Sequence, residues 1–125
     1  DGTIDMIATD HAPHSEKEKS GGLRSSLNGI VGLETAFPVL YTRLVRRGIL
    51  SLNKLVELMS TAPARRFGID IGNSTAEFEI STPYIVDSAE FLSLGKASPF
   101  VGMQVFGKCI KTTRNGKTVK EDKVN

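Results

Sequence analysis

The feature that most constrains this chain is residues 7–14, an apolar run that ends in one acid and two imidazoles, Ile-Ala-Thr-Asp-His-Ala-Pro-His. The run predicts a β-strand that Pro13 stops. Because side chains alternate between the two faces of a strand, Asp10 shares a face with Met6 and Ala8 and continues a buried stripe. Barrel enzymes place catalytic groups at the carboxyl ends of such strands. Because this run joins an acid to two imidazoles, we expect the chain to contact a metal ion.

We expect different roles for the two histidines of this run. His11 points away from Asp10, so we interpret it as a packed, hydrogen-bonded structural residue. His14 lies beyond the proline turn, where it is either a binding residue or a loop histidine without a partner. Asp10 itself is compatible with a catalytic role or with a cap at the strand end, because a motif this short is only a hypothesis.

The run resembles the last catalytic motif of the dihydroorotase family, within the amidohydrolase superfamily. Further segments are similar to the family in the same order and at comparable spacing: residues 29–35, Leu44-Val45 with Gly48, residues 63–69, Gly95-Lys96 and residues 98–100. Hydantoinases and allantoinases carry an Asp-His pair at this point but usually other residues behind it. The triplet Ala12-Pro13-His14 therefore favours dihydroorotase.

The resemblance implies an α/β fold. Residues 1–68 would form the last strand-helix portion of a TIM barrel, and residues 69–125 the C-terminal strands of a small β-sandwich domain, with the boundary near Ile69. A complete barrel needs about 250 residues, whereas this chain has 125. We therefore expect a C-terminal piece whose other metal ligands, a His-x-His pair and further histidines, lie upstream, and which is inactive alone.

The activity implied by the resemblance is the reversible cyclisation of N-carbamoyl-L-aspartate to L-dihydroorotate in de novo pyrimidine biosynthesis, with one or two Zn²⁺ ions. The resemblance makes Asp10 a metal neighbour and the acid/base that moves a proton from water to the departing nitrogen. It places His14 at the substrate carboxylate, with Asn28 and Gly29 offering backbone groups. The family often has Pro-Phe before this glycine, where this chain has Leu27-Asn28. A simple turn is the competing explanation for Gly29.

Several elements are predicted from local patterns. Residues 15–28 have no apolar period and predict a long loop. From Gly32 a helix is expected, bent or delayed by Pro38 and stopped by Gly48, with one buried face made of Leu33, Phe37, Leu40 and Leu44. Ser51 should cap a second helix that ends before Pro63, and a short third turn should span residues 62–67.

After Gly68 the helical period disappears. Phe78 and Ile80 alternate with glutamates as in a half-exposed strand, and Asn115-Gly116 predicts a tight hairpin. This β-rich part would lack the N-terminal strands of the family's composite domain. Its sheet edges would then be exposed, and exposed edges favour association.

Composition narrows the function classes. With 39% hydrophobic and 24% charged residues, the chain is typical of a soluble protein with a packed core. The net charge of +2 is small and spread out, so we expect no nucleic-acid partner. No apolar run approaches the roughly 20 residues of a membrane span and no signal peptide is visible, so a cytoplasmic protein is expected. Cys109 is interpreted as a packed residue.

Two alternatives stay open beside the main interpretation. One is another cyclic amidohydrolase, a hydantoinase or allantoinase. The other is a noncatalytic dihydroorotase-like subunit that serves assembly beside a transcarbamoylase. For the main interpretation the expected partners are the small-molecule substrate, further copies of the chain in a homo-oligomer, and aspartate transcarbamoylase.

Overall fold

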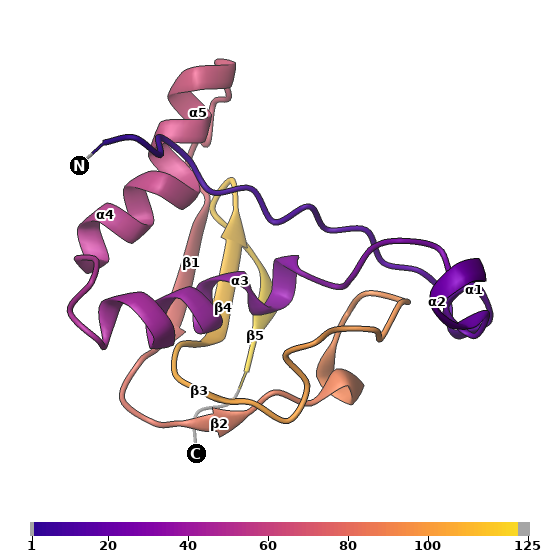
Figure 1. The fold of residues 1–125 in the computed structure, drawn as a ribbon. Helices are drawn as coiled ribbons and strands as arrows, with labels where there is room; N and C mark the ends of the chain where they lie inside the picture. The colour runs from indigo at the N-terminus through magenta and orange to yellow at the C-terminus, as the bar shows by residue number, and fades with distance from the viewer. Residues whose placement is uncertain (1, 123–125) are drawn as a thin grey trace.

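The N-terminal segment crosses the molecule as an extended chain. The computed structural model describes residues 2–122, and Figure 1 shows this segment in indigo. It forms no continuous strand: a single parallel bridge pairs His11 with Ile30, and the Ile7 amide donates to the Leu58 carbonyl at 2.9 Å. The predicted strand is therefore present only as extended backbone, because a strand requires a ladder of hydrogen bonds to a neighbour.

Two four-residue helices follow where a long loop was predicted. These are α1 (Glu16–Lys19) and α2 (Gly22–Ser25), which lie at the end of the molecule away from the other helices (Figure 1). The Ser15 side chain caps α1, and Glu18 bonds back to the Ser15 amide, which completes a capping box. The prediction was wrong because helices of one turn are too short to show an apolar period.

The third helix, α3 (Leu33–Leu40), continues directly into a π-helical turn, η1 (Tyr41–Val45). Pro38 lies inside α3 and has no N–H to donate to the carbonyl four residues earlier. The helix does not stop there. It widens one turn later, and the Tyr41 amide is shared between the carbonyls of Phe37 and Pro38.

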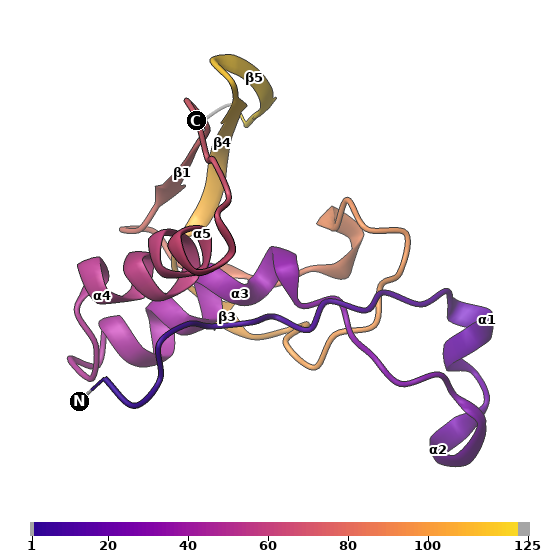
Figure 2. The ribbon, with the colours of Figure 1, turned by 90° about the horizontal axis from the view of Figure 1, so that it is seen from above.

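The buried residues of this helix differ from the predicted face. Thr35, Pro38 and Tyr41 are buried, whereas Leu33 is 63% exposed. Figure 2 shows the reason: α3 lies between the N-terminal segment and the sheet, so it is packed on two sides. Phe37 covers the sheet side, where its ring stacks on Phe78 with centroids 3.9 Å apart. A helix between two layers has no single apolar stripe.

The second predicted helix runs on without a break through α4 (Leu52–Val56), η2 (Glu57–Thr61) and α5 (Ala62–Phe67). The Ser51 side chain accepts from the Lys54 amide at 3.1 Å, which confirms the predicted cap. The prediction that the helix ends before Pro63 was wrong, because this proline occupies the first turn of α5, where its missing N–H is tolerated.

The proline has a consequence for packing. Since Pro63 cannot donate to the Leu58 carbonyl five residues earlier in the π-helical pattern, that carbonyl is free to accept from Ile7. The helix is thereby joined to the N-terminal segment. Leu55 and Leu58 are the buried side chains of this long helix.

The chain after Gly68 is rich in strands, as predicted. β1 (Thr75–Glu79), β4 (Lys108–Arg114) and β5 (Lys117–Glu121) form an antiparallel sheet in the order β1-β4-β5. The β4–β5 turn has Asn115 at φ 49° and Gly116 at φ 77°, which is the left-handed pair of a primed hairpin turn and confirms that prediction.

A smaller antiparallel pair joins β2 (Tyr84–Ile85) to β3 (Gln104–Val105), and a short 3₁₀ turn, η3 (Ser88–Glu90), follows β2. The core lies where this pair meets the start of α3. It consists of Val31, Val86, Phe91 and Val105, with Val39, Tyr84 and Met103 packed against it. The fold is therefore a mixed α/β arrangement whose core draws on residues before and after Gly68. Among residues 2–122, no helix is long and apolar enough to cross a membrane.

Candidate functional site

Asp10 lies at the end of the extended segment in a strained backbone conformation. Its φ is 47°, in the left-handed region that residues other than glycine rarely adopt. The residue is exposed, and its carboxylate makes no hydrogen bond or ion pair with any residue from 2 to 122. Such strain is found most often at functional sites.

The structure reverses the predicted burial of this segment. Ile4 is 68% exposed and Ala8 is exposed with Asp10, whereas Thr9 and His11 on the other face are half-buried. The expectation that Asp10 ends a buried stripe was therefore wrong for this chain. The reason is that the helical layer packs on the Thr9 face, whereas on the opposite face Met6 is half-buried but Ile4, Ala8 and Asp10 stay exposed.

His11 is held at the beginning of α3, which confirms its predicted structural role. Its Nδ1 accepts from the amides of Gly32 and Leu33, both at 3.2 Å. These amides belong to the first turn of the helix, whose N–H groups have no partner within the helix. An acceptor at Nδ1 requires that the neutral ring carry its proton on Nε2. His11 therefore caps α3 and is not available as a ligand through Nδ1.

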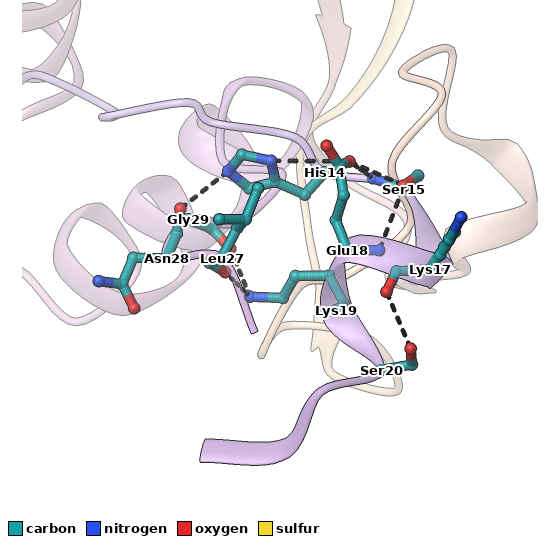
Figure 3. Close-up of polar contacts among 9 residues, drawn as sticks. All are labelled: His14, Ser15, Lys17, Glu18, Lys19, Ser20, Leu27, Asn28 and Gly29. Carbon is teal, nitrogen blue, oxygen red and sulfur yellow. Dashed lines mark hydrogen bonds and ion pairs between the residues drawn. The ribbon is translucent and has the colours of Figure 1, made fainter. Parts of the chain in front are cut away.

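His14 is bound into the loop that follows. Its Nε2 lies 2.9 Å from the Asn28 carbonyl, and its Nδ1 lies 3.8 Å from Glu18 Oε2 (Figure 3). The Ser15 hydroxyl is the main cause of a lowered pKa at Glu18, followed by the Ser15 amide, and the His14 charge adds a smaller contribution. His14 therefore has partners, which excludes the interpretation of an unengaged loop histidine.

Lys19 closes the same loop from the other side. Its Nζ donates to the carbonyls of Leu27 and Gly29, at 2.9 and 3.0 Å (Figure 3). Neither Glu18 nor Lys19 was singled out from the sequence. The Ser15-x-x-Glu18 spacing of a capping box was the signal that could have identified Glu18. Nothing in the sequence indicated Lys19, because its partners are backbone carbonyls eight and ten residues away.

Gly29 is required by a close approach of two backbone segments. Its φ is 132°, and a Cβ there would lie 2.5 Å from the Ala12 carbonyl oxygen. A side chain at this position would collide with Ala12, so only glycine allows the contact. The structure thus brings together His14, Asn28 and Gly29, three of the four predicted site residues. Asp10 is next to this group in sequence but shares no hydrogen bond with it.

The described residues hold only part of a metal site. Within residues 2–122, no group of three or more His, Cys, Asp or Glu side chains could hold a metal ion. A catalytic zinc site uses about three protein ligands and an open position. The Asp10 carboxylate is exposed and unengaged, so it fits the role of one oxygen donor and no more.

Comparison with known structures defines the class of protein. No protein-family model matches the chain. The fold is similar to L-hydantoinase (dihydropyrimidinase) from Arthrobacter aurescens, at 36% identity and a TM-score of 0.84, over 96% of this chain and 29% of that one. It is equally similar to dihydropyrimidinase from Brevibacillus agri, with a TM-score of 0.84 and 26% identity over 94% of this chain and 28% of that one. The class is therefore the cyclic amidohydrolases.

Sequence relatives define the family within this class. The chain is 44% identical to the dihydroorotase of Lactiplantibacillus plantarum over 128 aligned residues, which cover 94% of this chain and 29% of that protein. It is also 44% identical to the Geobacillus sp. dihydroorotase, over 95% of this chain and 30% of that protein. The chain belongs to the dihydroorotase family, which confirms the family predicted from residues 10–14. It spans about 30% of the length of these relatives.

Proposed function

We propose that this chain is the C-terminal part of a dihydroorotase, which interconverts N-carbamoyl-L-aspartate and L-dihydroorotate in de novo pyrimidine biosynthesis. The observation that carries the proposal is the 44% identity to dihydroorotases over nearly the whole chain. The hydrogen bond between His14 and Asn28 supports it, because it joins two residues that the family resemblance assigns to the substrate.

Asp10 is the proposed acid/base. A carboxylate that is exposed and without a partner can accept a proton from an attacking water and return it to the departing ring nitrogen. Bound Zn²⁺, as one or two ions with most ligands outside residues 1–125, would lower the pKa of that water to about 7. The left-handed backbone at Asp10 supports a functional role, since a strained residue persists only where its position is useful or enforced.

His14 is the proposed partner of a substrate carboxylate. Its Nδ1 is 3.8 Å from Glu18, beyond hydrogen-bonding distance, so this nitrogen can bind a ligand while Nε2 stays on the Asn28 carbonyl. Because Nε2 faces the Asn28 carbonyl, binding of a substrate carboxylate at Nδ1 requires a proton on both ring nitrogens. Asn28 and Gly29 would present backbone groups beside it.

The proposed architecture of the whole protein places residues 1–68 in the last part of a TIM barrel and residues 69–125 in a small β domain. The open face of the N-terminal segment supports this, because the apolar Ile4 is left exposed on it. We also propose a cytoplasmic homo-oligomer, associated with aspartate transcarbamoylase. The edge strands β1 and β5 are surfaces on which such association could form.

A chimera tests the function. Residues 1–125 replace the matching segment of the Lactiplantibacillus plantarum dihydroorotase, and hydrolysis of dihydroorotate, hydantoin and allantoin is measured. We expect turnover of dihydroorotate, lowered by roughly 100-fold or more in kcat by Asp10→Asn because the proton carrier is lost. Asp5→Asn, an exposed carboxylate in the same segment, is the matched control and should leave kcat within about twofold. Unimpaired turnover by the Asp10→Asn chimera would contradict the role of Asp10.

A hydantoinase is the second candidate, favoured by the 36% identity to the Arthrobacter aurescens enzyme. The higher identity to dihydroorotases makes it the weaker one. Preference of the chimera for hydantoin over dihydroorotate would reverse this order. A chimera that folds and assembles but hydrolyses none of the three substrates would favour a noncatalytic assembly subunit.

A further inference from the structure

A segment from the far end of the chain packs directly on the backbone of His14. This segment is residues 91–97, and Gly95 is its point of contact. A Cβ added to Gly95 would lie 2.7 Å from the His14 carbonyl oxygen, 2.8 Å from the His14 amide nitrogen and 2.9 Å from the Pro13 Cβ. Two of these three atoms are backbone, so they cannot move aside as a flexible side chain would. Only glycine allows this approach.

The segment 91–97 is held at several points. Phe91 is in the hydrophobic core at 8% exposure, and its carbonyl accepts from Lys96 Nζ at 2.6 Å. The Glu34 carboxylate accepts from the amides of Leu92 and Ser93 at 2.6 and 3.1 Å. The Ala97 carbonyl accepts from the Val31 amide at 2.8 Å. Contacts with α3 and the core therefore hold residues 91–97 in place. Gly95 packs on His14 from this fixed position.

His14 is constrained from two directions as a result. Gly95 contacts its backbone, and the Asn28 carbonyl binds its ring at 2.9 Å. Asn28 in turn precedes Gly29, whose backbone packs on Ala12. With the backbone and one ring nitrogen both fixed, the direction of the remaining nitrogen, Nδ1, is determined.

We propose that Gly95 is a positioning residue for substrate binding: it lets residues 91–97 close on the His14 backbone and thereby aims the imidazole at the substrate carboxylate. This inference rests on the proposed function and deepens it. Residues 91–97, which lie beyond Gly68, would then help to form the substrate site although they contribute no side chain to it. The effect acts through His14, so it concerns substrate affinity and leaves the proton transfer at Asp10 unchanged.

The test compares three variants of the chimera described above. Gly95→Ala should raise the KM for dihydroorotate roughly tenfold, the change expected on losing one hydrogen bond to a charged group, with kcat changed less than about threefold. Leu94→Ala, at a side chain that is 98% exposed, should change neither constant. Gly102→Ala adds backbone strain at φ 82° without any collision, and so controls for destabilisation alone. An unchanged KM in Gly95→Ala, or an equal rise in Gly102→Ala, overturns the proposal.

A second measurement separates this proposal from the proposed function. The ¹⁵N resonances of the His14 ring report its hydrogen bond to Asn28, and we expect Gly95→Ala to shift them while Gly102→Ala does not. If the unmodified chimera fails to hydrolyse dihydroorotate, the proposed function is wrong, and the ring resonances alone decide whether Gly95 positions His14. If Gly95→Ala does not fold, Glu34→Gln, which weakens the support at Leu92 and Ser93, should raise KM in the same direction. An unchanged KM and unchanged ring resonances in that variant contradict the proposal.

Discussion

At the scale of single residues, three polar side chains within five positions have three different environments. Asp10 is exposed and unengaged, His11 caps α3, and His14 is bound in the loop. The sequence correctly predicted that Asp10 and His11 point to opposite faces of the segment, because alternation of side chains along an extended chain is a local property. It could not predict which of the two faces would be covered.

The role of His11 predicts a loss of stability. In His11→Ala the amides of Gly32 and Leu33 lose their acceptor, so we expect the free energy of unfolding to fall by roughly 1–3 kcal/mol. Urea denaturation of the chain measures this change. His11→Asn keeps an acceptor oxygen and should recover part of the loss. Equal stability of His11→Ala and the unmodified chain would contradict the capping role.

At the scale of elements, the sequence predicted some helix caps correctly and others not. The predicted cap at Ser51 was confirmed, because N-cap preference is a property of the residue itself, whereas the predicted helix end before Pro63 was wrong. The predicted face of α3 was wrong at Leu33, which is exposed, because packing on two sides buries Thr35 and Pro38 instead. Contacts of that kind join residues far apart in the chain, and periodicity carries no information about them.

Glu34 links α3 to residues 91–97 and makes stability depend on pH. Burial opposes its ionisation, but hydrogen bonds from the Ser93 side chain and from the Leu92 and Ser93 amides, with the Lys96 charge, outweigh burial and lower the pKa of Glu34 below 4.5. A carboxylate whose pKa is lower in the folded state stabilises the fold above its unfolded pKa. That contribution is lost as the pH falls through the folded pKa.

The prediction concerns Glu34→Gln. At pH 7 this variant should be less stable than the unmodified chain, by roughly 1 kcal/mol for a partly buried group. Below about pH 4.5 the difference should shrink, because the carboxyl of the unmodified chain becomes protonated too. Urea denaturation between pH 7 and pH 3 gives both curves. Curves that remain parallel over this range would exclude a contribution from Glu34 ionisation.

At the scale of the whole molecule, the site is assembled from three distant segments. Residues 9–14 contact residues 28–32, and residues 95–97 pack on both. One face of the extended N-terminal chain stays open at Ile4 and Asp10. The chain therefore presents one side of a site, with the loop proposed to bind substrate formed and the metal-binding part incomplete among the described residues.

This incompleteness predicts the behaviour of the isolated chain. With Asp10 as a single available donor, the 125-residue chain should neither hydrolyse dihydroorotate in the presence of Zn²⁺ nor bind the ion at a defined stoichiometry. Isothermal titration with Zn²⁺ and an ultraviolet assay of dihydroorotate measure the two properties. Binding of one ion per chain with a Kd below about 1 μM would refute the idea that most ligands lie elsewhere.

The sequence by itself determined the family, the acid and imidazole motif, the Ser51 helix cap and the hairpin turn at Asn115-Gly116. Each of these depends on residue type and short spacing, which the sequence states directly. Only the tertiary structure decided that Asp10 lies on the open face, that Lys19 closes the loop on Gly29, and that Gly95 reaches the His14 backbone. Lys19 and Gly95 both contact backbone atoms of another segment, and backbone atoms are the same in every sequence.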